Sequence, residues 1–120
     1  MTDPYRTMPR RVKIGHLYFN LRQVDREMGD AGGFYGCTNV QDQEIMIQQG
    51  MKPHNLADTF IHEVMHGMCW VAEIGFRNTG PSPSDEEDFV THLAHAMCLF
   101  WQDNPQAARW WARTATMESA

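Results

Sequence analysis

The feature that most constrains this chain is the motif HExxH, present as HEVMH at residues 62–66, in the middle of an apolar segment. The segment predicts a helix over about 56–74 with Asn55 as its N-cap. Residues four apart lie one turn from each other on the same face of a helix. The side chains of His62 and His66 are therefore predicted to point in the same direction.

This arrangement predicts a zinc site with a general base beside it. Two imidazoles one turn apart can bind one cation, while Glu63, rotated by about 100° around the helix, can reach a water bound to that cation. Zinc accepts imidazole nitrogens and keeps a position open for water, whose pKa falls to about 7. The alternative is three solvated surface residues. It is disfavoured because ionisable groups with apolar neighbours on both sides are rarely left without a partner.

The third ligand is expected from the next helix, which is predicted over about 84–102. Glu87 is favoured because it shares its helical stripe with the apolar residues that are predicted to face the core. Those residues are Val90, Ala94 and Met97. The alternatives are Glu86, which is close to Glu87 in helical angle, and the two histidines of the same helix, His92 and His95.

The remaining segments predict a small sheet and one more helix. Residues 1–10 lack periodicity and are predicted to form an extended arm, so a single domain is expected over 11–120. Three strands are predicted, over 11–21, 34–40 and 44–49. A last helix is predicted to begin at Asn104, with Pro105 in its first turn. The predicted fold class is α+β, with a three-stranded sheet packed on the HExxH helix and two C-terminal helices.

Charge and composition narrow the classes of partner. A net charge of -5 lacks the basic balance of proteins that bind phosphates, so nucleic acid is not an expected partner. A membrane is not expected either, because no stretch approaches the roughly 20 apolar residues of a membrane span and the start lacks the apolar core of a signal peptide. Three cysteines without CxxC spacing are typical of free thiols in a reducing compartment. A cytoplasmic location is therefore expected.

Three segments carry a family resemblance: DTFIHEVMHGM at 58–68, EEDFVTHLAHAM at 86–97 and DNP at 103–105. Together with the strand EIMIQ they resemble short zincin-type metallopeptidases related to the IrrE/ImmA family, as encoded in phages and prophages. The likeness covers most of the chain after about Tyr35. The helix-turn-helix module of some relatives has no counterpart in this sequence, so the resemblance does not imply a built-in regulator of transcription.

The resemblance implies a minimal zincin domain with Zn²⁺ as its cofactor. It implies that His62, His66 and Glu87 are the metal ligands and that Glu63 is the catalytic residue. We therefore expect a zinc-dependent metallohydrolase, in particular a peptidase. It would cleave a host or phage protein by Glu-assisted attack of zinc-bound water, in the bacterial host cytoplasm if the chain is phage-encoded. The peptide could add as a strand to the exposed edge of the strand nearest the active-site helix.

Two alternative functions remain open. One is a non-catalytic, zinc-stabilised domain that binds a partner protein. The other is a DNA-associated protease similar to the SprT-like proteins, which share an HExxH helix. The acidic balance of the chain argues against the second alternative.

Overall fold

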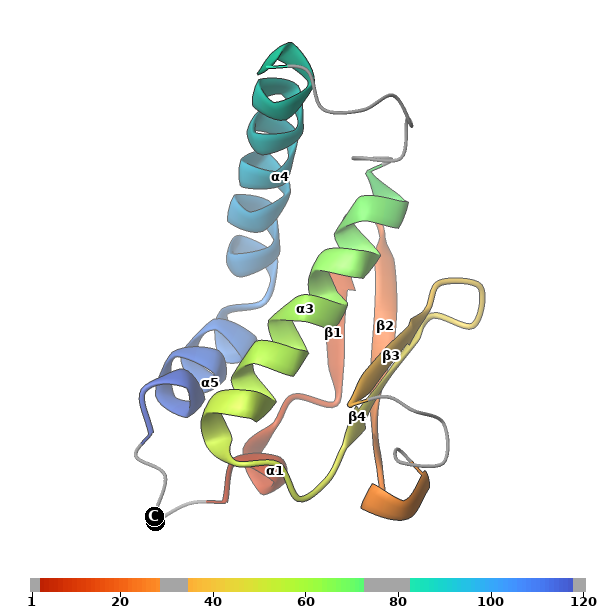
Figure 1. Ribbon diagram of the computed structural model, residues 1–120, viewed down its shortest axis with the longest axis vertical. Helices are drawn as coiled ribbons and strands as arrows, with labels where there is room; N and C mark the ends of the chain where they lie inside the picture. The colour runs from red at the N-terminus through yellow and green to blue at the C-terminus, as the bar shows by residue number, and fades with distance from the viewer. Residues whose placement is uncertain (1–2, 29–34, 73–82, 118–120) are drawn as a thin grey trace.

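The computed structural model describes residues 3–28, 35–72 and 83–117, and for residues 83–86 it describes the backbone alone. Within these residues the fold is α+β, as predicted. The strands are β1 (Arg11–Ile14), β2 (Leu17–Val24), β3 (Gly36–Asn39) and β4 (Glu44–Gln48), and the long helices are α3 (Pro53–Val71), α4 (Pro83–Asp103) and α5 (Pro105–Ala115). Helix α3 lies between the sheet on one side and α4 and α5 on the other (Figure 1).

The described sheet has four strands in the order β1-β2-β4-β3, so the prediction of three strands was wrong. The single strand predicted over 11–21 is a hairpin, because the chain reverses between Ile14 and Leu17. Gly15, the first residue of this two-residue turn, has a φ of 59°. A glycine at the first central position is the signature of a tight II′ hairpin turn. Strand β2 pairs with β4 in parallel, and β3 pairs with β4 in antiparallel orientation. Strands β1 and β3 are therefore the edges of the described sheet.

Helix α3 begins three residues earlier than predicted, with Lys52 as its N-cap and Pro53 in the first turn. Proline lacks an N–H group, so the start of a helix is the position where it costs least. The predicted end near residues 74 and 75 lies outside the described residues. One face of α3 is buried at intervals of four residues, as an amphipathic helix on a sheet requires. The apolar residues of this face are Leu56, Phe60, Val64 and Met68.

Close packing of α3 on the sheet depends on Gly67. A Cβ atom at this position would lie 2.7 Å from Cδ1 of Ile14, a fully buried side chain of β1. The absence of a side chain therefore lets β1 approach α3 in the turn that follows the HExxH motif. Two turns earlier on α3, Phe60 makes an edge-to-face contact with Trp110 of α5, which completes the core.

Asn104 occupies the edge of β1. Its side-chain oxygen accepts a hydrogen bond from the Lys13 N–H at 2.8 Å, and its side-chain nitrogen donates to the Lys13 carbonyl at 2.8 Å and to that of Phe100 at 2.8 Å. The amide thus takes the place of a neighbouring strand. Asn104 is also the N-cap residue of α5, so the predicted start of the last helix is confirmed.

The first ten residues differ from the predicted extended arm. Pro4–Thr7 forms a single helical turn, α1, and Met8 is buried in the core. The indole nitrogen of Trp110 donates to the Pro4 carbonyl at 2.8 Å, and the Tyr5 hydroxyl donates to the Gln48 carbonyl at 2.8 Å. These contacts attach the N-terminal segment to α5 and β4.

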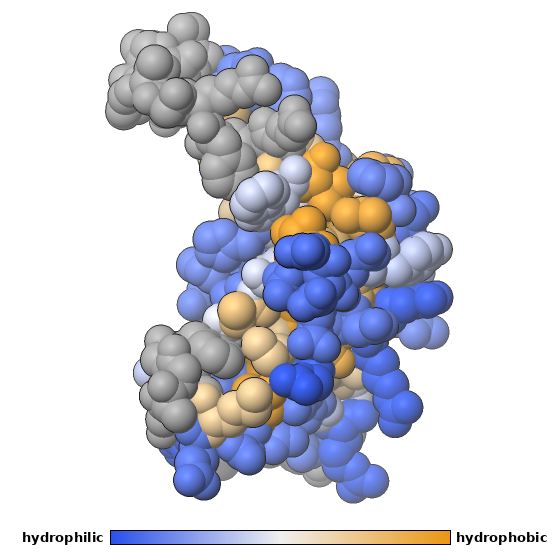
Figure 2. Space-filling view, turned by 90° about the vertical axis from the view of Figure 1, so that its right-hand side faces the viewer, coloured by the Kyte–Doolittle hydropathy of each residue, from blue (hydrophilic) through white to orange (hydrophobic). Residues whose placement is uncertain are grey.

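The surface in Figure 2 is largely hydrophilic, with apolar side chains gathered in the upper part of this face. Among the described helices none is long and apolar enough to cross a membrane.

Candidate metal centre

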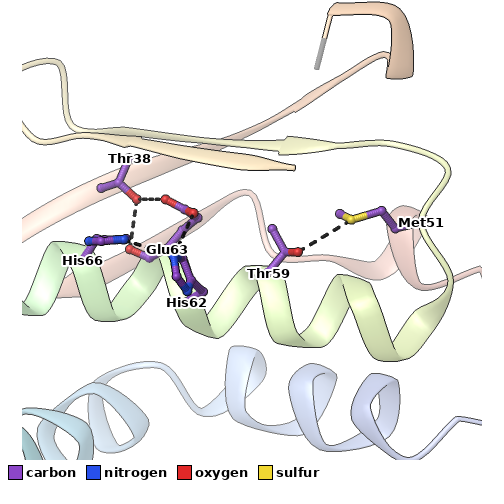
Figure 3. Close-up of polar contacts among 6 residues, drawn as sticks. All are labelled: Thr38, Met51, Thr59, His62, Glu63 and His66. Carbon is purple, nitrogen blue, oxygen red and sulfur yellow. Dashed lines mark hydrogen bonds and ion pairs between the residues drawn. The ribbon is translucent and has the colours of Figure 1, made fainter. Parts of the chain in front are cut away.

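His62 and His66 converge as their spacing on α3 predicts. Their Nε2 atoms lie 3.1 Å apart, their rings meet edge to face, and both side chains are exposed (Figure 3). Two nitrogens bound to one tetrahedral zinc at about 2.0–2.1 Å are separated by about 3.3 Å. The observed separation is close to this value, so the two imidazoles fit a shared zinc ion in donor type and in spacing.

Glu63 lies between the histidine pair and the sheet. Its side chain is only 8% exposed. One carboxylate oxygen, Oε1, accepts a hydrogen bond from the Thr38 hydroxyl at 2.7 Å, and the other, Oε2, lies 4.0 Å from Nε2 of His62 (Figure 3). The carboxylate therefore stands beside the two imidazoles, where it can accept a proton from a group that they hold.

The sequence of β3 explains why this strand comes so close to α3. Gly36 and Thr38 lie two residues apart and so face the same side of the sheet, toward α3. A Cβ atom on Gly36 would lie 2.8 Å from Cγ of Glu63 and 2.8 Å from Cγ2 of Thr59. The missing side chain at position 36 is what allows the Thr38 hydroxyl to reach the carboxylate.

Within the described residues, strand β3 also has an unpaired edge next to the histidine pair. The Gln48 N–H donates to the Tyr35 carbonyl at 2.8 Å, which makes these two residues a hydrogen-bonded pair of the ladder. Because such pairs alternate along an antiparallel ladder, the backbone groups of Gly36 and Thr38 point away from β4. No other strand of the described chain pairs with this edge.

The structure does not place Glu87, the residue of α4 favoured as the third ligand, beside the histidine pair. The side chain of Glu87 is exposed, and the residues that the structure describes contain no group of three ligand-type side chains around one point. The structure thus brings together His62, Glu63 and His66 but not Glu87. The side chain of Glu86 is not among those that the structure describes.

The predicted core-facing stripe of α4 was also wrong in phase. Val90 is 51% exposed and Ala94 is exposed, whereas the helix faces the core through Leu93, Ala96, Met97 and Phe100. The first turns of α4 extend beyond the last described turn of α3 in Figure 1, so this part of the helix has no described element to cover it. Met97 is the one residue of the predicted stripe that packs on the core.

The two histidines of α4 face a different environment. Both line an apolar hollow of about 240 Å³ together with Ile14, Met68 and Val71. His92 also contacts its own helix, with Nδ1 lying 2.7 Å from the Asp88 carbonyl oxygen. At the usual 100° per residue, Met68 and Val71 are rotated by about 120° or more around α3 from each residue of the histidine pair. The structure does not bring His92 or His95 to that pair.

Cys69, one turn beyond His66 on α3, is a further donor that could be considered. Burial raises the pKa of its thiol. A cysteine binds a metal as the thiolate, so burial disfavours the form of Cys69 that would bind.

Thr38 is a polar contact of the site that the sequence interpretation missed. The signal that could have found it is the alternation of Gly36 and Thr38 on one face of a strand predicted beside the HExxH helix.

Comparison with known proteins gives no family assignment. No family model matches the chain, and neither the curated proteins nor the solved structures contain a significant match.

Proposed function

We propose that the chain is a zinc-dependent metallopeptidase with a minimal zincin-like domain that cleaves a peptide or protein substrate. The observation that carries this proposal is the approach of the His62 and His66 Nε2 atoms to 3.1 Å beside the buried carboxylate of Glu63. We place the activity in the cytoplasm, which the free thiols of Cys37, Cys69 and Cys98 support.

In this proposal His62 and His66 hold the zinc ion, and the third ligand is Glu87 of α4, the residue that the family resemblance implies but that the structure does not bring to the histidine pair. When bound, zinc acts as a Lewis acid that polarises a carbonyl and lowers the pKa of water to about 7. Glu63 takes up a proton at Oε2, the oxygen that faces His62 at 4.0 Å, and later passes it to the leaving amine. Its low exposure keeps bulk water away from the carboxylate while it holds that proton.

The substrate class follows from the edge of β3. The N–H and C=O groups of Gly36 and Thr38 point away from β4, so an extended peptide can pair with them as an added strand. The Thr38 hydroxyl on this same strand contacts Glu63, so a peptide on the edge lies next to the proposed base. A net charge of -5 speaks against nucleic acid as the substrate.

The test of the mechanism is Glu63→Gln, with Asp58→Asn as the control. Asp58 is an exposed carboxylate on α3 one turn before His62, so its change alters charge on the same helix without altering the base. Glu63→Gln should keep zinc, measured by metal analysis of the purified protein, and should lower cleavage of fluorescently labelled casein by about 10²-fold or more. Retained cleavage in Glu63→Gln refutes the mechanism. Wild-type protein that binds zinc without cleaving any protein substrate supports the non-catalytic alternative.

The ligands are tested separately by His62→Ala, His66→Ala and Glu87→Ala. Each histidine change should abolish stoichiometric zinc binding, because one remaining imidazole on α3 cannot hold the ion in a tetrahedral protein site. Glu87→Ala should weaken zinc binding, and Glu86→Ala should not. The opposite order of the two glutamate variants assigns the third ligand to Glu86.

A further inference from the structure

The Thr38 hydroxyl holds one particular oxygen of the Glu63 carboxylate. Its Oγ1 lies 2.7 Å from Oε1 and 3.0 Å from the Glu63 carbonyl oxygen. A hydroxyl carries a single proton, and a carboxylate is the stronger acceptor of the two, so the proton is donated to Oε1. The bond joins the middle of β3 to the middle of α3.

This bond decides which way the carboxylate points. With Oε1 attached to Thr38, the other oxygen is directed toward His62, 4.0 Å from its Nε2 atom (Figure 3). Glu63 has three rotatable side-chain bonds, and without the hydroxyl donor its buried carboxylate would turn toward another donor or toward solvent. The hydroxyl therefore selects one orientation out of several.

We propose that Thr38 is a positioning residue of this site, which orients the Glu63 carboxylate so that Oε2 faces the histidine pair. Only the expected effect of Thr38 on turnover rests on the proposed function. The orientation itself is a property of the metal-free protein. Because Thr38 also belongs to the strand whose edge is proposed to bind the substrate, one hydrogen bond fixes the base relative to that edge.

The experiment compares Thr38→Val with Thr38→Ser, and uses Thr59→Val as a matched control. Valine keeps the shape of threonine without the hydroxyl, while serine keeps the hydroxyl. Thr59 is a buried threonine one turn before Glu63, and its Oγ1 lies 3.6 Å from the Met51 sulfur rather than near the carboxylate (Figure 3). Thr59→Val thus makes the same chemical change as Thr38→Val, close to Glu63 on α3, without removing a hydrogen bond to the carboxylate.

The first measurement uses side-chain ¹³C relaxation of Glu63 in the metal-free protein. Thr38→Val should increase the mobility of the carboxylate arm, whereas Thr38→Ser and Thr59→Val should leave it as in the wild type. Thr38→Ala, which also lacks the hydroxyl, serves if the valine variant folds poorly. An equally ordered Glu63 in both variants without the hydroxyl overturns the proposal.

The second measurement separates kcat from KM in cleavage of labelled casein by the zinc-loaded protein. Thr38→Val should lower kcat by roughly 10- to 100-fold with little change in KM, because hydrogen bonds to charged groups are worth about that factor. Thr38→Ser should restore kcat, and Thr59→Val should not affect it. If the relaxation result is as expected but the wild type cleaves nothing, the peptidase proposal fails and the positioning role stands. A change in KM alone overturns the positioning role.

Discussion

Replacing Gly36 by alanine tests whether the closeness of β3 to α3 shapes the site. The new Cβ would lie 2.8 Å from two side-chain atoms, Cγ of Glu63 and Cγ2 of Thr59, and 3.2 Å from Oε2 of Glu63. Ordinary contacts of this kind are 3.4 Å or longer, so the strand or the side chains must shift by about 0.6 Å. Both neighbours are buried, so neither can move aside without disturbing the packing around it.

The expected cost is that of overpacking a core, about 1–3 kcal/mol. For a domain of this size that cost corresponds to a fall in Tm of roughly 4–12 °C. The same shift would stretch the bond between Thr38 and Glu63 from 2.7 Å to about 3.3 Å, beyond the range of good O–H···O geometry. Gly36→Ala should therefore lower both the stability and the proposed turnover.

Urea unfolding of a double-variant cycle tests whether the new Cβ contacts cause the expected loss of stability in Gly36→Ala. Thr59→Ser deletes the Cγ2 atom that the new methyl group would meet, so Gly36→Ala combined with Thr59→Ser should recover part of the lost free energy of unfolding. Gly50→Ala is a contrasting control. Nothing lies within 4 Å of a Cβ there, and its φ of 84° makes backbone strain the only expected cost. Wild-type stability in Gly36→Ala, or costs that simply add in the double variant, would refute the contact-based reasoning.

Two further predictions concern residues outside the site that stabilise the fold. Asn104→Ala removes three hydrogen bonds, two of them to the backbone of Lys13 at the edge of β1. It should lower the free energy of unfolding by about 1–3 kcal/mol in urea titrations. Burial raises the pKa of Tyr5 above 10.0. The unfolded chain therefore loses this proton first, and the stabilisation is complete below about pH 10 and lost as the pH rises through the folded-state pKa. In Tyr5→Phe this decline of Tm with pH should be weaker.

Patterns within short stretches of the sequence predicted helices and strands well where one such pattern dominates the stretch. The HExxH helix, the strands over 36–39 and 44–48 and the last helix after Asn104 all follow from periodicity and from proline placement. The start of α3 was predicted at Asn55 because a side-chain cap was given more weight than Pro53, which fits best in a first helical turn. The strand over 11–21 was not divided, since its β-branched and aromatic residues favour extended structure on both sides of Gly15, which marks the reversal.

Tertiary relations were predicted less well because they depend on which neighbours an element meets. The phase of the buried stripe on α4 is set by its contacts with α5, α3 and β1, and the periodicity of α4 alone does not reveal it. The bond between Thr38 and Glu63 joins residues 25 positions apart, on two elements whose register only the fold defines. The alternation of Gly36 and Thr38 indicates which residues of the strand share a face, but it does not identify Glu63 as the partner of Thr38.

The proposed metal centre combines a histidine pair that the structure assembles with a ligand from α4 that it does not bring to this pair, and this makes zinc affinity informative. His62 and His66 are oriented by helix geometry on an element with a buried face, so their pairing at 3.1 Å does not require a metal. A ligand from α4 must come from the part of that helix where the described side chains are exposed, including Glu87. Two imidazoles alone leave a tetrahedral zinc one protein ligand short of the three typical of catalytic sites. Any loss of zinc affinity measured in Glu87→Ala would therefore report how far α4 contributes to the centre, independently of the histidine pair.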